Sequence, residues 1–460
     1  MKNLLLCLWR CLSVYILLSA QAQAQPLDFA TIRLGDAMPV VLVVGGIQGD
    51  EPGGFSAATL VATRYTVENG AIWVVPNLNF PSIIMRSRGI NGDMNRKFAA
   101  LDMRDPDFST VRRIQDLIRH PRVGLVLNLH DGSGYYRERK INALCNPSRW
   151  GQSVIIDQER LASDVFMGDL GREARRVAED VNKRLIHKMD KLHVRNTNTA
   201  SGDREMEKSL SYYAVRHGKA AFGLEASKEF PVELRTYYHL CMVESLLRQA
   251  GIRFSRNFDL TPGSVQRVLQ ADLNISFAEK RIFLPLDDAR ASINGLPLPK
   301  DSAAVASKPI MAVLPCKRNT EALCIHYGNR TITHIRPDWR ELDNSLQAVR
   351  VTVDGQEKAI PFGEVLPVAE NLHIHPHDGF RINAIGFAGK KGDDSGITLR
   401  RKNFLRSYSI DRQGTLYRIE VYKKQHFVGM FLARFGKMDK MANKRPLLPS
   451  IPGPESDLGF

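Results

Sequence analysis

The chain has 460 residues, of which 43% are hydrophobic and 25% are charged, and its formal net charge is +15. This composition is that of a folded globular protein and excludes a disordered chain. Six cysteines are too few for a scaffold built on disulfide bonds, and at about 150 residues per domain the chain should form roughly three domains.

The N-terminus predicts an export signal. Lys2 precedes an apolar stretch, and small residues alternate at Ala20, Ala22 and Ala24. This pattern is typical of a cleaved secretory signal peptide, so we expect residues 1–24 to be removed and the protein to be periplasmic. A retained anchor helix is the alternative. No later apolar run reaches the ~18 residues that a bilayer span requires, so we expect no stable membrane span.

Residues 25–255 alternate between strand-like and helix-like segments. Short apolar runs indicate buried strands at 39–44, 71–75, 124–129 and 220–226. Helical periodicity lies between and after them, at 51–65, 107–120, about 160–190 and 232–251. Strands that alternate with helices predict an α/β domain with a parallel or mixed sheet flanked by helices.

Beyond residue 255 the segments become short, rich in β-branched and aromatic residues, and separated by turns. They predict a small all-β domain over residues 256–345 and a β-sandwich, of the immunoglobulin-like type, over 346–436. Residues 437–460 carry four prolines and little periodicity, and we expect a disordered tail there.

The four cysteines outside the predicted signal divide into two kinds. Cys316 and Cys324 flank a turn-like segment between two strand-like runs, where an oxidising compartment would favour a disulfide across a hairpin. Cys145 and Cys241 are far apart in the sequence, and we expect them to be free, buried thiols.

The basic charge indicates an anionic partner. Removal of residues 1–24 takes away Lys2 and Arg10 and no acid, which leaves +13. Nucleic acid, lipid headgroups and acidic polymers all bind such a surface. Export argues against nucleic acid and leaves the carboxylate-rich peptides of a bacterial cell wall and anionic lipids. Solubility alone is the other explanation of the charge.

Polar residues gather where the predicted strands end. Gln48 and Glu51 follow the first of these strands, His130 lies at the end of the third, and Glu225 lies at the end of the fourth. In open α/β sheets, ligands bind outside the carboxyl ends of the strands. We therefore expect these four side chains to converge.

Their chemistry suits a catalytic metal. Such a site commonly uses three protein ligands, here Gln48, Glu51 and His130, and keeps a fourth position for water. Glu225 is a candidate general base. Arg88 and Arg96 are donors for an oxyanion or a carboxylate. Taken one at a time, a solvated loop carboxylate or a hydrogen-bonded core histidine is the more ordinary interpretation.

The joint pattern resembles the M14 zinc carboxypeptidases. Asn95-Arg96 matches the carboxylate-binding pair of that family, Arg88 matches its oxyanion arginine, and Glu225 matches its general base. Gln48 departs from the pattern, because the family nearly always has histidine there. An amide oxygen is a weaker zinc ligand than imidazole.

One branch of the family also uses Gln-x-x-Glu: the exported peptidoglycan DL-carboxypeptidases that set cell shape in helical and curved bacteria. Members combine a carboxypeptidase domain with two β-domains, which matches the predicted layout of this chain. The resemblance implies one Zn²⁺ per chain. It also implies cleavage of the peptidoglycan tripeptide L-Ala-γ-D-Glu-meso-diaminopimelate, a stem peptide, with release of diaminopimelate.

Further residues are expected to line a substrate pocket because their segments follow the metal histidine or precede the base. These are Ser133, Tyr135, Trp150 and Ser211; Trp150 suits a packing role equally well. Arg86 and Arg137 are the alternatives for holding a carboxylate if Arg96 does not.

Two rival functions remain open at this point. One is an M14-related deacylase of the aspartoacylase and succinylglutamate desuccinylase type, which shares the arginine ahead of an Asn-Arg pair. The other is a catalytically dead wall-binding protein, whose metal site is lost through Gln48. In either case the β-domains are candidates for binding protein partners.

Overall fold

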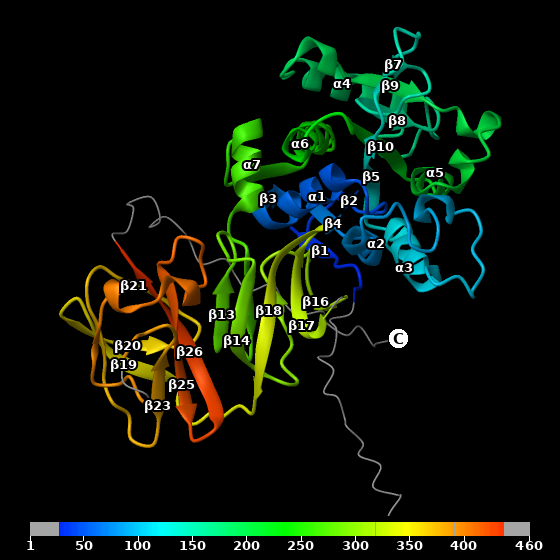
Figure 1. Cartoon of the computed structure of the whole chain (residues 1–460). Helices are drawn as coiled ribbons and strands as arrows, with labels where there is room; N and C mark the ends of the chain where they lie inside the picture. Colours follow the sequence, from blue (N-terminus) through cyan, green and yellow to red (C-terminus); the bar gives the residue numbers. More distant parts are fainter. Residues whose placement is uncertain (1–26, 318, 390–391, 437–460) are drawn as a thin grey trace, which may run out of the picture.

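The computed structural model of the chain describes residues 27–317, 319–389 and 392–436 (Figure 1). The signal predicted over 1–24 and the tail predicted over 437–460 lie outside these residues. The described chain forms one α/β domain followed by two β-rich domains.

The α/β domain is built on a seven-stranded mixed sheet. Its order is β1 (Ile32–Leu34), β4 (Ala71–Val75), β2 (Val40–Val44), β5 (Val123–Gly132), β10 (Ala220–Ser227), β8 (Ser153–Ile156) and β9 (His193–Asn196). The four strands β4, β2, β5 and β10 run parallel, whereas β1 and β8 pair antiparallel with their inner neighbours. The four apolar runs predicted as strands are these four parallel strands, and the predicted mixed sheet is confirmed.

Helices cover both faces of this sheet. On one face α1 (Pro52–Arg64), α4 (Leu170–Asn182) and α6 (Val232–Gln249) pack against one another. On the other side lie α3 (Phe108–Arg119) and α5 (Leu210–Arg216) (Figure 1). In α3, burial of Val111, Ile114 and Ile118 follows the helical period, which is why the sequence pattern predicted this helix.

The first domain extends past the boundary that we predicted at residue 255. Strand β11 (Arg253–Arg256) pairs with β3 (Tyr65–Asn69), and α7 (Pro262–Gln270) packs against α6. Val265 and Leu269 of α7 belong to the core of the α/β domain. A short helix with few apolar residues could not be assigned to either side from sequence.

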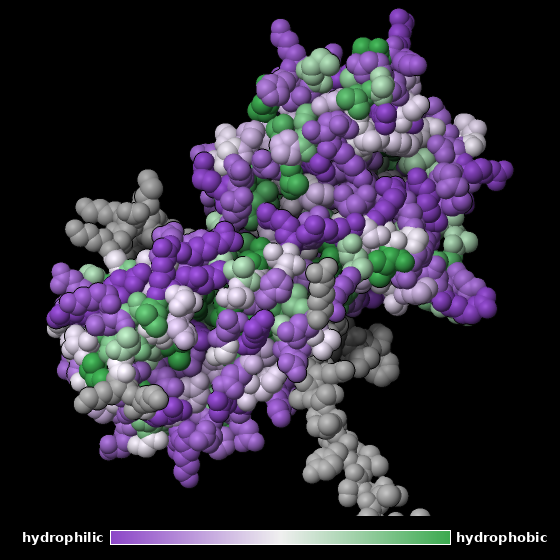
Figure 2. Space-filling view, viewed as in Figure 1, coloured by the Kyte–Doolittle hydropathy of each residue, from purple (hydrophilic) through white to green (hydrophobic). Residues whose placement is uncertain are grey.

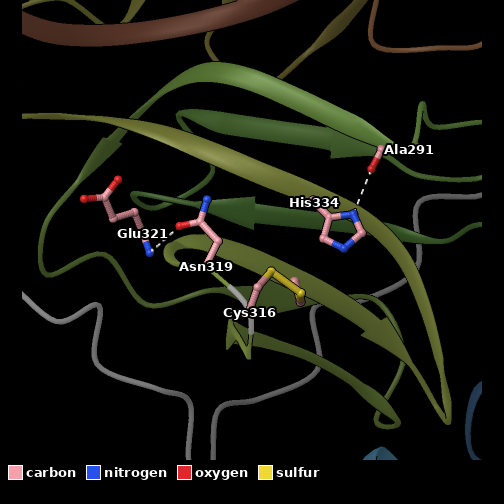
Figure 3. The surroundings of a disulfide bond; sticks show 6 residues. Ala291, Cys316, Asn319, Glu321 and His334 are labelled. Carbon is pink, nitrogen blue, oxygen red and sulfur yellow. Dashed lines mark hydrogen bonds between the residues drawn. A yellow bond between two sulfur atoms is a disulfide. The ribbon is translucent and has the colours of Figure 1, made fainter.

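The middle domain contains two small sheets. Strands β13 (Ile282–Pro285), β12 (Asn274–Phe277) and β15 (Val305–Ala306) form one, and β14 (Ser292–Pro299), β18 (Arg330–Arg340), β17 (Asn319–Tyr327) and β16 (Met311–Cys316) form the other. A disulfide joins Cys316 to Cys324 in the β16–β17 hairpin, with His334 of β18 beside it (Figure 3). Cys145 and Cys241 are free and buried, as predicted.

The C-terminal domain is a sandwich of two four-stranded sheets around one core. One sheet is β20 (Gln356–Pro361), β19 (Ala348–Val353), β22 (Leu372–Ile374) and β24 (Thr398–Leu399). The other is β21 (Val365–Val368), β26 (His426–Phe435), β25 (Leu416–Lys423) and β23 (Arg381–Ala384). Side chains of both sheets share the core. The sandwich is confirmed; the immunoglobulin-like type stays a prediction.

The core of the middle domain is shared with both neighbours. Phe55 of α1, together with Phe80 and Ile83 of α2 (Phe80–Met85), is buried in it from the first domain, and Phe427 and Met430 of β26 enter it from the C-terminal domain. The three domains are therefore joined by packed apolar contacts.

Hydrophilic side chains dominate the face of the molecule in Figure 2, and hydrophobic ones are scattered among them. Among the helices of the described residues, none combines the length and the apolar character that a bilayer crossing requires.

Candidate metal and substrate site

Strand register places the predicted base beside the predicted metal histidine. In the parallel pair β5–β10, Glu225 lies directly opposite His130, and both side chains are buried. Strand β2 is the other neighbour of β5, and the chain leaves β2 through the loop that carries Gln48 and Glu51. The four predicted side chains therefore meet at one edge of the sheet.

The three predicted metal ligands converge on a single point. The Nδ1 atom of His130 lies 3.0 Å from Gln48 Oε1 and 3.0 Å from Glu51 Oε2. Glu51 precedes α1, which begins with Pro52, and its side chain makes no capping hydrogen bond to the helix. The carboxylate is thus directed at the site.

A carboxylate that the sequence analysis missed orients the amide ligand. Gln48 Nε2 donates to Asp93 Oδ1 over 2.8 Å, so the amide oxygen of Gln48 faces His130. The Oδ1 atom of Asp93 also accepts the backbone N–H of Asn95 (3.0 Å), and its Oδ2 atom accepts from Arg88 Nε (3.0 Å). Asp93 thereby connects Gln48, a predicted metal ligand, with Arg88 and with the backbone of Asn95.

Asp131 holds the carboxylate of Glu51, a predicted metal ligand, in position. The backbone N–H of Asp131 donates to Glu51 Oε2 (3.0 Å), and Asp131 Oδ2 accepts the N–H of Gly53 at the start of α1 (2.8 Å). Arg235 and His239 of α6 hold the same carboxylate at 3.2 and 3.0 Å. These contacts attach the first turn of α1 to strand β5.

Glycine is required at two positions where backbone passes close to the site. A Cβ atom at Gly132 would lie 2.7 Å from Glu225 Oε2 and 2.5 Å from the nitrogen of Gly151. At Gly49 it would lie 2.1 Å from the carbonyl of Ser82 in α2. A side chain at either position would displace the base or the Gln48 loop.

Negative charge accumulates in this site. Burial, followed by the charges of Glu51 and Asp131, raises the pKa of Glu225 to about 8. Burial alone would lower the pKa of His130, but its hydrogen bond and proximity to Glu51 outweigh burial and raise it. Lys228 lies 3.4 Å from Glu51 Oε1 and 3.0 Å from Asp50, and it offsets part of the charge.

This donor set fits a divalent metal. One imidazole nitrogen and two oxygens meet within hydrogen-bonding distance, and the glutamine is already turned with its oxygen inward by Asp93. The surrounding excess of carboxylates is the environment in which a cation is stabilised.

Three of the predicted substrate residues, Asn95, Arg96 and Ser211, belong to two segments that meet next to His130. Asn95 and Arg96 are in the 3₁₀ turn Met94–Arg96; Asn95 Oδ1 accepts the N–H of Leu210, and Asn95 Nδ2 lies 3.5 Å from His130 Nε2. Arg96 is 3.4 Å from Glu205, and Arg88 is 3.3 Å from Glu51. Ser211, next to Leu210 in α5, is buried beside the Asn95 contact.

Trp150 and Ser133 were also predicted to line the pocket, and they are joined through their backbones, because Trp150 N donates to Ser133 O (3.2 Å). Arg195 of β9 covers the indole ring at 3.7 Å. Register places Arg195 opposite Ile155 and Ile155 opposite Gly223, so Arg195 shares the sheet face of Glu225.

The two alternative arginines are engaged elsewhere. Arg137 is buried and donates to the carbonyl oxygens of Tyr136, Met189 and Lys191. Arg86 ends α2 in a left-handed conformation and donates to the carbonyl of Asn329 in the middle domain. Arg96 directly follows Asn95, whose amide nitrogen lies 3.5 Å from His130 Nε2, and it remains the predicted donor for the carboxylate.

Four site residues were not found from the sequence: Asp93, Asp131, Arg195 and Lys228, of which Asp131 directly follows His130. Asp93 lies within the block that contains Asn95-Arg96, and Lys228 lies three residues after Glu225, so spacing offered a signal for both. Arg195 offered none, because β9 is short and was not predicted.

The chain matches two protein-family models. Residues 1–270 match the family model described as the catalytic domain of carboxypeptidases controlling helical cell shape, peptidase family M99. Residues 342–436 match the C-terminal domain of metallo-carboxypeptidase.

Among solved structures, the chain is similar to the cell shape determinant protein Csd4 of *Helicobacter pylori*. The apo and tripeptide-bound forms are 38% identical with a TM-score of 0.82, over 89% of this chain and 100% of that chain. The form bound to mDAP, described as a D,L-carboxypeptidase, is 40% identical with a TM-score of 0.81, over 86% of this chain and 96% of that chain.

A curated relative shares a smaller segment. The N-alpha-acetyl-L-2,4-diaminobutyric acid deacetylase of *Halomonas elongata* is 32% identical over 102 residues. The match spans 20% of this chain and 29% of that protein.

Removal of the Asp93 carboxylate should weaken metal binding. In Asp93→Ala the Gln48 amide loses the acceptor that turns its oxygen inward, and loss of such a supporting contact typically costs about 10- to 100-fold in affinity. Calorimetric titration with Zn²⁺ measures the effect. Asp102→Ala, which removes an exposed carboxylate paired with Arg104, is the matched control. Unchanged affinity in Asp93→Ala would show that Gln48 is oriented by other contacts.

Glu225 should make the metal-free protein sensitive to pH. Its folded pKa of about 8 lies above the ordinary 4.5, so stability present below pH ~4.5 is lost as the pH rises through about 8. The side chain in Glu225→Gln cannot ionise, so the melting temperature of this variant in chelator should exceed that of the wild type by an amount that grows with pH over this window. A difference in melting temperature between the two proteins that does not change with pH would contradict the raised pKa of Glu225.

Proposed function

The chain belongs to peptidase family M99, the carboxypeptidases that control helical cell shape, and we propose that it is a zinc DL-carboxypeptidase of the bacterial periplasm. It is a metallocarboxypeptidase by family. We propose that the metal is zinc, with one ion per chain. The observation that carries it is the convergence of Gln48, Glu51 and His130, with Glu225 in register beside them.

The proposed substrate is the uncrosslinked peptidoglycan tripeptide L-Ala-γ-D-Glu-meso-diaminopimelate, cut to a dipeptide with release of diaminopimelate. The *H. pylori* relative binds a tripeptide and mDAP and is a D,L-carboxypeptidase. The net charge of +15 supports a substrate with several carboxylates. Periplasmic location rests on the predicted signal peptide, and we expect no nucleic acid partner.

Gln48, Glu51 and His130 would hold the zinc, which supplies Lewis-acid activation of water and of the scissile carbonyl. The side chains of the protein then move protons and bind charge. Glu225 accepts a proton from the attacking water and delivers it to the leaving amine, so that the amide bond breaks as a new carboxylate forms.

Two sets of donors stabilise the charges of the substrate. Arg88 lies 3.3 Å from Glu51 and is about half exposed, so its guanidinium can reach an oxyanion that develops beside the metal ligands. Asn95 and Arg96 offer an amide and a guanidinium to the terminal carboxylate. Ser133, Trp150 and Ser211 complete the proposed pocket, and Arg195 on Trp150 adds a cation at its far side.

Family membership favours this function over a catalytically dead wall-binding protein. The partial match to a deacetylase is a reason to test the deacylase alternative as well. For this test, the purified protein is incubated with N-acyl amino acids and, separately, with murein peptides. Mass spectrometry of the products separates the two: free diaminopimelate supports the carboxypeptidase, and release of an acyl group alone supports the deacylase.

Glu225→Gln should abolish most turnover without loss of metal. The variant keeps the shape of the side chain but removes the proton acceptor, so kcat on the tripeptide should fall by about 10²-fold or more. Zinc content, measured on the same preparation, should stay at the wild-type level. Glu233→Gln, at the start of α6, is the control. Near-wild-type turnover in Glu225→Gln would remove Glu225 from the mechanism.

Arg96→Ala should weaken recognition of the terminal carboxylate. A charge-assisted hydrogen bond contributes roughly 1.5–3 kcal/mol, so kcat/KM should fall by about 10- to 100-fold. Arg104→Ala, which removes an exposed ion-paired arginine, is the control. Amidation of the carboxylate should harm the wild type far more than Arg96→Ala. Equal sensitivity in both would assign Arg96 a structural role and leave Arg195 as the candidate.

A further inference from the structure

A second region of the molecule concentrates positive charge far from the sheet edge that holds the metal ligands. The segment 400–412 joins β24 to β25 through two 3₁₀ turns, Arg401–Asn403 and Arg406–Tyr408. Arg290 of the middle domain lies against it. We call the resulting cluster of five cations the cationic face: Arg290, Arg401, Lys402, Arg406 and Arg412.

Hydrogen bonds to neutral groups hold three of these cations, Arg290, Arg406 and Arg412, together. Arg290 donates to the carbonyl of Arg406 (2.6 Å) and to the hydroxyl of Ser409 (3.1 Å). Arg406 in turn donates to the carbonyl of Arg412 (3.0 Å), and Arg412 donates to that of Ala289 (3.0 Å). A Cβ atom at Gly414 would lie 2.5 Å from Arg406 Cγ and 3.2 Å from Arg401 Nη2. The side chains of Arg401 and Arg406 therefore both lie next to Gly414.

The cations of this face are not engaged in ion pairs: within the part of the chain that the structure describes, none of the five is paired with a carboxylate. The acid of the segment, Asp411, is buried and accepts the N–H groups of Thr415 and Leu416 and the Thr415 hydroxyl. Like charges within the Debye length of about 8 Å repel, and an external anion would relieve that repulsion.

Two exposed apolar side chains lie among these cations. Leu405 is 54% exposed and Tyr408 is 53% exposed. An aliphatic and an aromatic side chain surrounded by arginine and lysine suit the boundary of a bilayer, where the apolar groups enter the headgroup region and the cations meet phosphates. A purely anionic polymer would use the cations and leave Leu405 without a role.

We propose that the cationic face, with Leu405 and Tyr408, binds the surface of a bilayer rich in anionic phospholipids. The surface is formed jointly by the middle and C-terminal domains, and the proposal is independent of the reaction at the metal site. Binding of this kind is reversible and weakens with salt, because few apolar groups take part and most of the attraction is electrostatic.

Co-flotation of the purified full chain with vesicles tests the proposal. Vesicles of phosphatidylglycerol mixed with phosphatidylcholine should carry the protein at 50 mM salt, and the bound fraction should fall at least fivefold at 500 mM. Vesicles of phosphatidylcholine alone should carry little. Failure to bind phosphatidylglycerol vesicles at 50 mM salt, or capture by purified glycan strands in place of vesicles, would overturn the proposal.

A pair of matched double variants assigns binding to this face. Lys402→Glu with Leu405→Asp should lower vesicle affinity by at least tenfold. Lys358→Glu with Val305→Asp makes the same change in charge at exposed residues elsewhere and should bind as the wild type does. Equal losses in both would assign the effect to net charge and overturn the proposal. Melting temperature checks the fold of each variant, and tripeptide cleavage, which should be unchanged in both, is scored separately.

Discussion

The arrangement of the site depends on the enclosure of three carboxylates around one histidine. Glu51, Asp131 and Glu225 are all buried next to His130. Asp131 is satisfied by Arg235, His239 and a helix N–H, and Glu51 has Arg88 and Lys228 near it. Burial and the other two carboxylates instead raise the pKa of Glu225 to about 8. A metal cation placed between Gln48, Glu51 and His130 would complete the compensation of charge.

The loop between α2 and the Met94–Arg96 turn holds several of the site's side chains in position through Asp93. Asp93 binds the Gln48 amide, the Arg88 guanidinium and the backbone of Asn95 at once. A displacement of Asp93 would therefore move a metal ligand, an oxyanion donor and a carboxylate donor together. The contact with Asp93 keeps the amide of Gln48 from rotating, so that its oxygen faces His130.

The middle domain supports the same machinery from outside. Phe55 lies four residues after Glu51, and Phe80 and Ile83 lie shortly before Arg88; all three are packed in the core of the middle domain. Both segments that present site residues are thus anchored in a second domain. The same domain supplies Arg290 to the cationic face, so one structural unit connects the catalytic edge of the sheet with the surface proposed to meet a membrane.

The amino-acid sequence by itself determined the parallel strands, the main helices and the side chains at the strand ends, because apolar periodicity and motif spacing are local properties of a chain. Gln48, Glu51, His130 and Glu225 could be named as a group from their positions after buried strands. The tertiary structure alone decided the role of Asp93, the stacking of Arg195 on Trp150 and the inclusion of α7 in the first core. It alone joined Arg290 to a segment more than a hundred residues away. Each of these features depends on contacts between segments that are distant in the sequence. Local sequence patterns do not indicate which distant segments will come into contact.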